Sequence, residues 1–185
     1  MMIRKATSAD IPAVAAIYDA LLRREEQGLL ATGWTRGVYP TEQTAWDALD
    51  AGTLYVLEDG GRVTAAAKID HHQMAQYAQC AWRNDAPPEQ VLVVHTLCIP
   101  PRYAGQGLGR ECVSRIKQHA EAAGCTAIRL DTWAGNVPAV TLYQKNGFSL
   151  CGRAQVLFQG KIPEELVFLE YCCPPSANPP AVCGG

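Results

Sequence analysis

The stretch PPRYAGQGLGREC, residues 100–112, places Gly105, Gly107 and Gly109 at alternate positions directly before a run of good helix formers. The N-terminus of a helix offers unpaired backbone N–H groups and a partial positive charge, so it attracts phosphate groups. Glycines in front of it let the backbone approach the phosphate oxygens closely. The nearby charged residues are mostly basic: Arg102, Arg110, Arg115 and Lys117 against Glu111. The stretch therefore predicts a loop that binds a phosphorylated ligand.

Two common phosphate-binding motifs do not match this loop. A P-loop requires Gly-Lys-Ser/Thr, but Gly109 is followed by Arg110 and Glu111. A dinucleotide fingerprint requires a third glycine where Arg110 stands, and its glycine turn follows a strand without the intervening residues 100–103. A dinucleotide oxidoreductase therefore remains a weaker alternative, which NADH binding would support.

Hydrophobic periodicity and turn residues predict the elements that position the loop. The run EQVLVVHTLCI, residues 89–99, is apolar and flanked by prolines, as in a central strand buried on both faces. Asp59-Gly60-Gly61 predicts the turn of a hairpin over residues 53–70. The other expected elements are a strand before Thr7, helices over about 9–24, 42–52, 107–123 and 136–147, and strands over 126–131, 148–158 and 165–171. Their order predicts an α/β fold whose sheet is part antiparallel and part parallel.

Length and composition limit the class of protein. The 185 residues suffice for one domain, expected over residues 1–173, with a Pro-rich, disordered tail over residues 174–185. The apolar share of 48% and the net charge of −2 favour a globular protein that binds neither nucleic acid nor membranes. No apolar run approaches the roughly 18 residues of a membrane span, and the N-terminus does not read as a signal peptide. We therefore expect a cytoplasmic protein.

The eight cysteines are expected to be reduced thiols, because no export signal accompanies them. Cys98, Cys112 and Cys125 stand in apolar or periodic segments, which predicts that they are buried. Cys172 and Cys173 lie near the C-terminus without paired C-x-x-C spacing. No metal site is expected.

Two blocks of the sequence resemble the GCN5-related N-acetyltransferase (GNAT) family. In VVHTLCIPP and YAGQGLGR, Gly107 and Gly109 match the family's Arg/Gln-x-x-Gly-x-Gly/Ala motif, while Ala104 stands where Arg or Gln is usual. The second block, AIRLDTWAGNVPAVTLYQKNGF, resembles the family's next strand and helix. The resemblance covers about residues 2–172. It implies a mixed sheet of six to seven strands with helices on both faces and central strands splayed around acetyl-CoA.

The resemblance also implies an activity and a binding site for acetyl-CoA. The implied reaction is direct transfer of an acetyl group from acetyl-CoA to a primary amine of a small molecule or of a protein or peptide. A non-catalytic acyl-CoA-binding regulatory module is the alternative. The residues implied to bind acetyl-CoA are Leu97, Cys98, Ile99, Ala104, Gly105, Gln106, Gly107, Leu108, Gly109, Arg110, Asn136 and Tyr143.

Two side chains are candidates for proton transfer. Tyr143 matches the tyrosine that commonly serves as general acid toward the CoA sulfur, although a packed core tyrosine is the alternative. His95 is the candidate base, because imidazole titrates near neutral pH and residues 95, 97 and 99 share one strand face. The His-x-Leu-x-Ile pattern is similar to that strand in arylalkylamine N-acetyltransferases. A polar strand residue with satisfied hydrogen bonds is the alternative for His95.

Aromatic residues in the polar loops are candidates for the acceptor pocket, though they equally suit a role in covering the sheet. The strands that hold His95 and Asp131 are expected to splay apart at the thioester. The candidate acceptor-binding residues are Trp34, Tyr39, Tyr77, Trp82 and Asp131. Pairing of the last strands across a homodimer is compatible with the sequence.

Overall fold

The computed structural model describes residues 1–158 and 160–174, so the tail expected over 174–185 lies outside them except for its first residue. The described chain forms a seven-stranded sheet in the order β1-β2-β3-β4-β5-β7-β6. The strands are β1 (Met2–Lys5), β2 (Leu54–Asp59), β3 (Arg62–Asp70), β4 (Val91–Cys98), β5 (Ala127–Trp133), β6 (Ser149–Phe158) and β7 (Ile162–Cys172). The α-helices are α1 (Ile11–Glu26), α2 (Glu42–Asp50), α3 (Leu108–Ala122) and α4 (Val137–Lys145). The predicted order of elements is confirmed.

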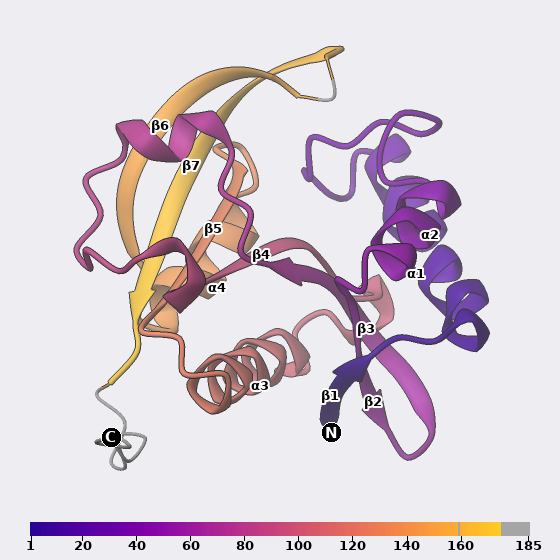
Figure 1. Ribbon diagram of the computed structural model, residues 1–185. Coiled ribbons are helices and arrows are strands. Elements are labelled where there is room, and N and C mark those ends of the chain that lie inside the picture. Colours follow the sequence, from indigo (N-terminus) through magenta and orange to yellow (C-terminus); the bar gives the residue numbers. More distant parts are fainter. Residues whose placement is uncertain (159, 175–185) are drawn as a thin grey trace.

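The sheet is mixed, as predicted. Strands β1 to β4 are antiparallel neighbours, whereas β4 and β5 run parallel and are joined by the crossover helix α3. Strand β7 pairs antiparallel with both β5 and β6. The β5–β7 pairing ends at Trp133↔Leu166, but the β6–β7 pairing continues to Phe158↔Ile162. The β6–β7 hairpin, orange and yellow in Figure 1, therefore extends beyond the end of β5.

Helices cover both faces of the sheet (Figure 1). On one face, Val113 and Ile116 of α3 pack in a core with Leu92 and Ile128 of the central strands. On the other face, α1 and α2 cover the N-terminal half, where Ile11 packs in a second core with residues of β2 and β3. A separate segment that contains a 3₁₀ helix (Ala75–Gln79) covers the C-terminal half of this second face. Each half of the second face is therefore covered by its own segment of the chain.

Strand β4 changes direction at Thr96. The register passes from Lys68↔His95 to Ala66↔Cys98, so three steps on β4 face two on β3, and Thr96 adopts a φ of +52°. This is a β-bulge, which bends the strand that carries it. The pairing of β4 with β5 ends just before the bulge, at Val94↔Leu130. The two central strands therefore diverge from His95 and Asp131 onward, as predicted.

Local sequence signals explain the helix boundaries. The Thr41 side chain accepts a hydrogen bond from the Thr44 backbone N–H and caps α2. Gly124 follows α3 with a φ of +75°, which is the usual conformation after a helix C-terminus. Cys98, Cys112 and Cys125 are buried, as predicted.

Among the helices of the described residues, none combines the length and the apolar character that crossing a membrane requires.

Candidate active site

The glycine loop, residues 104–110, presents bare backbone in front of α3. Gly105 and Gly107 have φ values of +74° and +80°, in the left-handed region that favours glycine. A Cβ atom placed on either glycine would meet no atom within 4 Å. Gly107 is also the N-cap of α3. A ligand can therefore approach the backbone of both residues without a side chain in the way.

Most N–H groups of the glycine loop are free to bind a ligand. The N–H groups of Gly105 and of residues 107–110 donate to no acceptor among the described residues. The Gln106 N–H is different, because it donates to the Tyr103 carbonyl oxygen at 3.1 Å. These five donors at the positive end of a helix form a site for an anion.

Gly109 differs from the other two glycines of the loop. A Cβ atom there would lie 3.1 Å from Leu142 Cδ2 in α4 and 3.6 Å from Ile99 Cδ1. The missing side chain therefore allows α3 to pack closely against α4. Gly109 contributes packing as well as a free N–H group.

A shallow, basic pocket of about 400 Å³ lies beside the segment that precedes the loop. Its lining includes Arg102 together with Arg23 and Arg24 of α1. Arg23 is paired with Asp19 at 2.8 Å. The local excess of guanidinium groups suits a negatively charged ligand that extends from the glycine loop.

The edge of β4 that faces β5 is left without a strand partner after Val94. The backbone of Leu97 lies on this edge, while the Cys98 side chain is buried in the core with α1 and α2. Unpaired backbone groups on a strand edge can bind an extended ligand as an added strand. The opening between β4 and β5 is therefore suited to an extended amide-containing chain.

Helix α4 places Tyr143 in the core beside this opening. Its side chain is 8% exposed, and its ring lies 5.4 Å from that of Phe148. Burial raises the pKa of the phenol well above its usual value, so the hydroxyl is protonated at neutral pH. The hydroxyl makes no hydrogen bond to any described residue, which leaves it free to donate to a ligand. Asn136 caps α4 by accepting from the Ala139 N–H at 3.3 Å.

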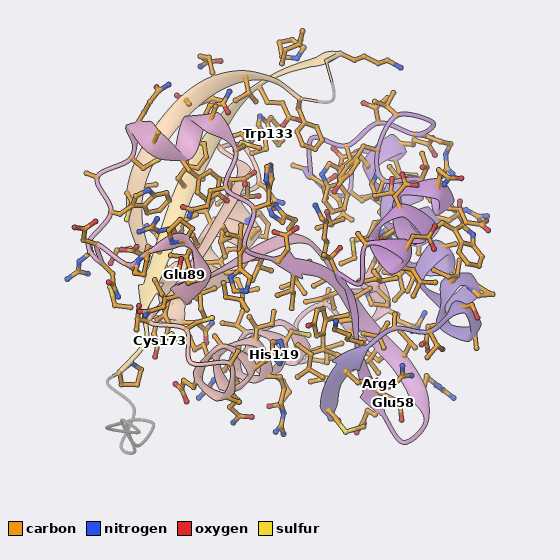
Figure 2. All side chains as sticks on the ribbon, in the orientation of Figure 1. Arg4, Glu58, Glu89, His119, Trp133 and Cys173 are labelled. Atoms are coloured by element: carbon orange, nitrogen blue, oxygen red, sulfur yellow. The ribbon has the colours of Figure 1, made fainter. Side chains whose placement is uncertain are left out.

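A pocket of about 470 Å³, here called the central pocket, opens where β4 and β5 diverge. Of the candidates from the sequence, Trp34, Tyr39, His95 and Asp131 line it, whereas Tyr77 and Trp82 do not. Figure 2 shows Trp133, a further lining residue, between the β6–β7 hairpin and the violet segment before α2. The central pocket therefore joins the loops of the N-terminal half to the end of the central strands.

His95 is held by a carboxylate of the neighbouring strand. Its Nε2 atom lies 3.2 Å from Asp70 Oδ1, and Lys68 Nζ lies 3.1 Å from Asp70 Oδ2. Burial raises the pKa of the Asp70 carboxyl, but hydrogen bonds from His95, the His72 backbone and Lys68 outweigh it, and the pKa is lowered overall. Asp70 is therefore ionised and fixes the orientation of the imidazole ring.

Tyr77 and Trp82 do not line the central pocket but are linked by hydrogen bonds to Asp131, which does. The Tyr77 hydroxyl donates to Asp131 Oδ1 at 2.7 Å, and the Trp82 indole N–H donates to the Tyr77 carbonyl oxygen at 2.8 Å. Tyr77 is only 2% exposed. Burial also raises the pKa of the Asp131 carboxyl. The two aromatic residues therefore hold Asp131 at the pocket wall.

Glu164 of β7 also lines the central pocket, and its carboxyl group is not paired with a described cation. The residue is 6% exposed, and its Oε1 atom is buried without a hydrogen-bond partner. Burial, together with the nearby Asp131 and Glu25 carboxylates, raises the pKa of Glu164 to about 7. A carboxylate of this kind in a pocket is typical of a functional site.

Sequence reasoning missed Asp70 and Glu164. Asp70 precedes His71-His72 at the end of a predicted strand, but only the β3–β4 register brings its side chain to His95. Glu164 stands in KIPEELVF, where the alternation of polar and apolar residues does not show which of two adjacent glutamates faces inward. Strand pairing was the missing information in both cases.

Known proteins share this fold and parts of this sequence. The family model described as "Acetyltransferase (GNAT) family" matches residues 15–148. A streptothricin acetyltransferase of Streptomyces lavendulae is 26% identical over 114 residues, which are 60% of this chain and 57% of that protein. The chain spans between about a third and just over half of the curated relatives that it matches.

Solved structures are similar over nearly the whole chain. A GNAT-family acetyltransferase from Streptococcus agalactiae has a TM-score of 0.74 and 22% identity, covering 92% of this chain and 94% of that one. An acetyltransferase from Salmonella typhimurium, solved with its cofactor acetyl-CoA, has a TM-score of 0.63 and 22% identity, with coverage of 97% and 98%. At these identities the structures show a common fold. Because the family model spans most of the sequence, the chain belongs to the GNAT acetyltransferase family.

Proposed function

We propose that this protein is an N-acetyltransferase that transfers the acetyl group of acetyl-CoA directly to a primary amine. The observation that carries the proposal is the divergence of β4 and β5, because the central pocket opens there and β4 continues from that point toward the glycine loop. Membership of the GNAT family supports it. The Salmonella typhimurium neighbour with acetyl-CoA bound supports the choice of acyl donor.

The residues present fit acetyl-CoA. The free N–H groups of Gly105 and of residues 107–110 would bind its pyrophosphate, and the open space above both left-handed glycines leaves room for it. The unpaired edge of β4 at Leu97 and Ile99 would bind the amides of the pantetheine arm. When bound, the molecule supplies an activated acetyl group as a thioester.

The reaction requires a neutral amine and a protonated leaving group. The amine nitrogen forms a bond to the acetyl carbon, the carbon–sulfur bond breaks, and the products are an N-acetyl amide and CoA with a free thiol. Tyr143 keeps its hydroxyl proton at neutral pH and would donate it to the departing sulfur. His95, oriented by Asp70, would accept the proton that the ammonium form of the acceptor loses, directly or through water.

The central pocket favours a small acceptor. Its volume of about 470 Å³ lies within the range of about 300–1,000 Å³ that is usual for small-molecule sites. Walls from α2, the 32–39 segment and the β6–β7 hairpin surround it on several sides. A small-molecule amine therefore fits better than a folded protein surface. Action in the cytoplasm and assembly as a homodimer stay predictions.

Release of the CoA thiol from acetyl-CoA, measured with a panel of primary amines, tests the proposal. We expect thiol release that depends on the amine. We expect Tyr143→Phe to lower the rate by about 10²–10⁴-fold, because it removes the general acid. Calorimetric binding of CoA should be unchanged in this variant. Binding of CoA without transfer to any amine would favour the non-catalytic acyl-CoA-binding module instead.

A further inference from the structure

Glu164 is a buried acid without a partner in the central pocket. Its side chain is 6% exposed, and no described residue donates a hydrogen bond to either carboxylate oxygen. No described cation lies within ion-pair distance of it. Burial of an unpaired carboxylate costs free energy, so such a group is retained where a ligand supplies the missing charge.

The other ionisable groups of the central pocket do not neutralise Glu164. They are Asp47, Lys68, His72, His95 and Asp131. Lys68 is the one lysine among these lining residues, and it is already paired with Asp70 at 3.1 Å. The Asp131 carboxyl is bound by a neutral phenol, Tyr77. Carboxylates therefore dominate the pocket, which favours a cationic ligand.

Glu164 and Asp131 stand at different positions along the sheet, and both line the central pocket. Asp131 pairs with Phe168 in the β5–β7 register, and Glu164 stands four residues further along β7. At about 3.3 Å per residue, this offset corresponds to about 13 Å along the strand. A ligand with two nitrogen atoms joined by a flexible chain can contact both carboxyl groups.

Aromatic rings line the space between these two places. Trp34 and Tyr39 pack edge to face at 5.8 Å between ring centroids, and Tyr39 packs in the same way on Phe158 at 5.0 Å. All three line the central pocket, together with Trp133. Such rings contact aliphatic chains well, and their faces attract ammonium groups.

We propose that the acceptor is an aliphatic diamine or polyamine, with the reacting amine between His95 and Asp131 and a second ammonium group bound to Glu164. The inference rests on the proposed function, because it assigns the acceptor of the same site. A charge-assisted hydrogen bond to a buried carboxylate is strong enough to dominate the choice among amines of equal length.

Matched amines test the proposal with the full chain and acetyl-CoA. The probes are α,ω-diaminobutane, α,ω-diaminopentane and α,ω-diaminooctane, each against the monoamine of equal length, with ω-aminopentanol as a neutral polar analogue. We expect kcat/KM to be about 10- to 100-fold higher for at least one diamine than for its monoamine. Equal kcat/KM for every diamine and its monoamine would overturn the proposal.

Two substitutions on β7 locate the effect. Glu164→Gln should reduce the diamine-to-monoamine ratio of kcat/KM to near one. Glu165→Gln is the matched control, because Glu165 is partly exposed and paired with Arg153 at 2.9 Å, and its ratio should equal that of the unmodified protein. An unchanged ratio in Glu164→Gln would contradict the assignment of Glu164.

A binding measurement separates this inference from the proposed function. Calorimetry of α,ω-diaminopentane and pentylamine with CoA-saturated protein reports acceptor binding without transfer. Tighter binding of the diamine that disappears in Glu164→Gln supports the inference even if no acetyl transfer is found. Equal binding of both amines overturns it, whereas lack of acetyl transfer to any amine contradicts only the proposed function.

Discussion

Two glutamates of β7, six residues apart, are buried to a similar degree but are surrounded very differently. Glu170 is 1% exposed and accepts hydrogen bonds from Arg129 Nε at 3.0 Å and from the Arg83 backbone N–H at 2.7 Å. Glu164 is 6% exposed and has no such partner. At one end of the strand a glutamate therefore stabilises the fold through an ion pair and hydrogen bonds. At the other end a glutamate has a buried carboxylate oxygen without a hydrogen-bond partner.

The difference follows from the course of the neighbouring strands. Glu170 pairs in register with Arg129 of β5, so a cation is fixed beside it. Glu164 lies beyond the last β5–β7 pair, Trp133↔Leu166, where β5 no longer contributes side chains. The part of β7 that extends past β5 is therefore the part available to a ligand.

Loss of the Glu170 charge should have the largest effect on stability. Glu170→Gln leaves the Arg129 guanidinium, which is also buried, without its counter-charge. We expect the free energy of unfolding at pH 7 to fall by about 3–5 kcal/mol. Urea denaturation measures it, and a loss below about 1 kcal/mol would contradict the structural role of the pair.

Loss of the Glu164 charge should have the opposite sign. The pKa of Glu164 is raised in the folded protein to about 7, so the unmodified protein loses stability as the pH rises from about 4.5 through 7. Glu164→Gln, which mimics the protonated acid, should therefore be more stable by about 1–3 kcal/mol at pH 8 and equal at pH 4. Urea denaturation at both pH values checks this. A variant less stable at pH 8 would show that the carboxylate is already satisfied.

Gly33 tests the packing around Glu164. A Cβ atom on Gly33, whose φ is +81°, would lie 2.5 Å from Glu164 Oε1. Gly37 has a similar φ of +74° with no atom within 4 Å, so Gly37→Ala is the matched control for backbone strain alone. We expect Gly33→Ala to lose about 1 kcal/mol more than Gly37→Ala, measured by thermal unfolding. Equal losses would argue against close contact at Glu164.

The adjacent Glu165 should show the smallest effect. It forms an exposed ion pair with Arg153, and their side chains are 40% and 54% exposed. Glu165→Gln should change the free energy of unfolding by less than about 0.5 kcal/mol in urea. A larger change would mean that Glu165 contributes more to stability than the exposure of its side chain indicates.

Patterns within single elements were sufficient to predict most of the fold. The apolar run over residues 89–99 predicted β4, and the helices expected over 42–52 and 107–123 correspond to α2 and α3, because strand burial and helix capping depend on nearby residues. Resemblance to a known family led to the glycine loop and Tyr143 as the acetyl-CoA site, which stays a prediction.

Contacts between distant segments were not predictable in the same way. The Asp70–His95 pair depends on the β3–β4 register, and the unpaired state of Glu164 depends on where β5 ends. The aromatic candidates show the same limit. Trp34 lines the central pocket and Trp82 does not, although both stand in polar loops.

The most direct test of the contrast between the two glutamates is the titration of the Glu164 carboxyl by carbon NMR in CoA-saturated protein, assigned with Glu164→Gln. We expect a pKa of about 7 without an acceptor. Binding of α,ω-diaminopentane should lower it, because a neighbouring cation favours the ionised form, whereas pentylamine should not. A pKa near the ordinary value of 4.5 in the free protein would contradict the proposal that this carboxylate binds a cationic group of the acceptor. A pKa that the diamine leaves unchanged would contradict it as well.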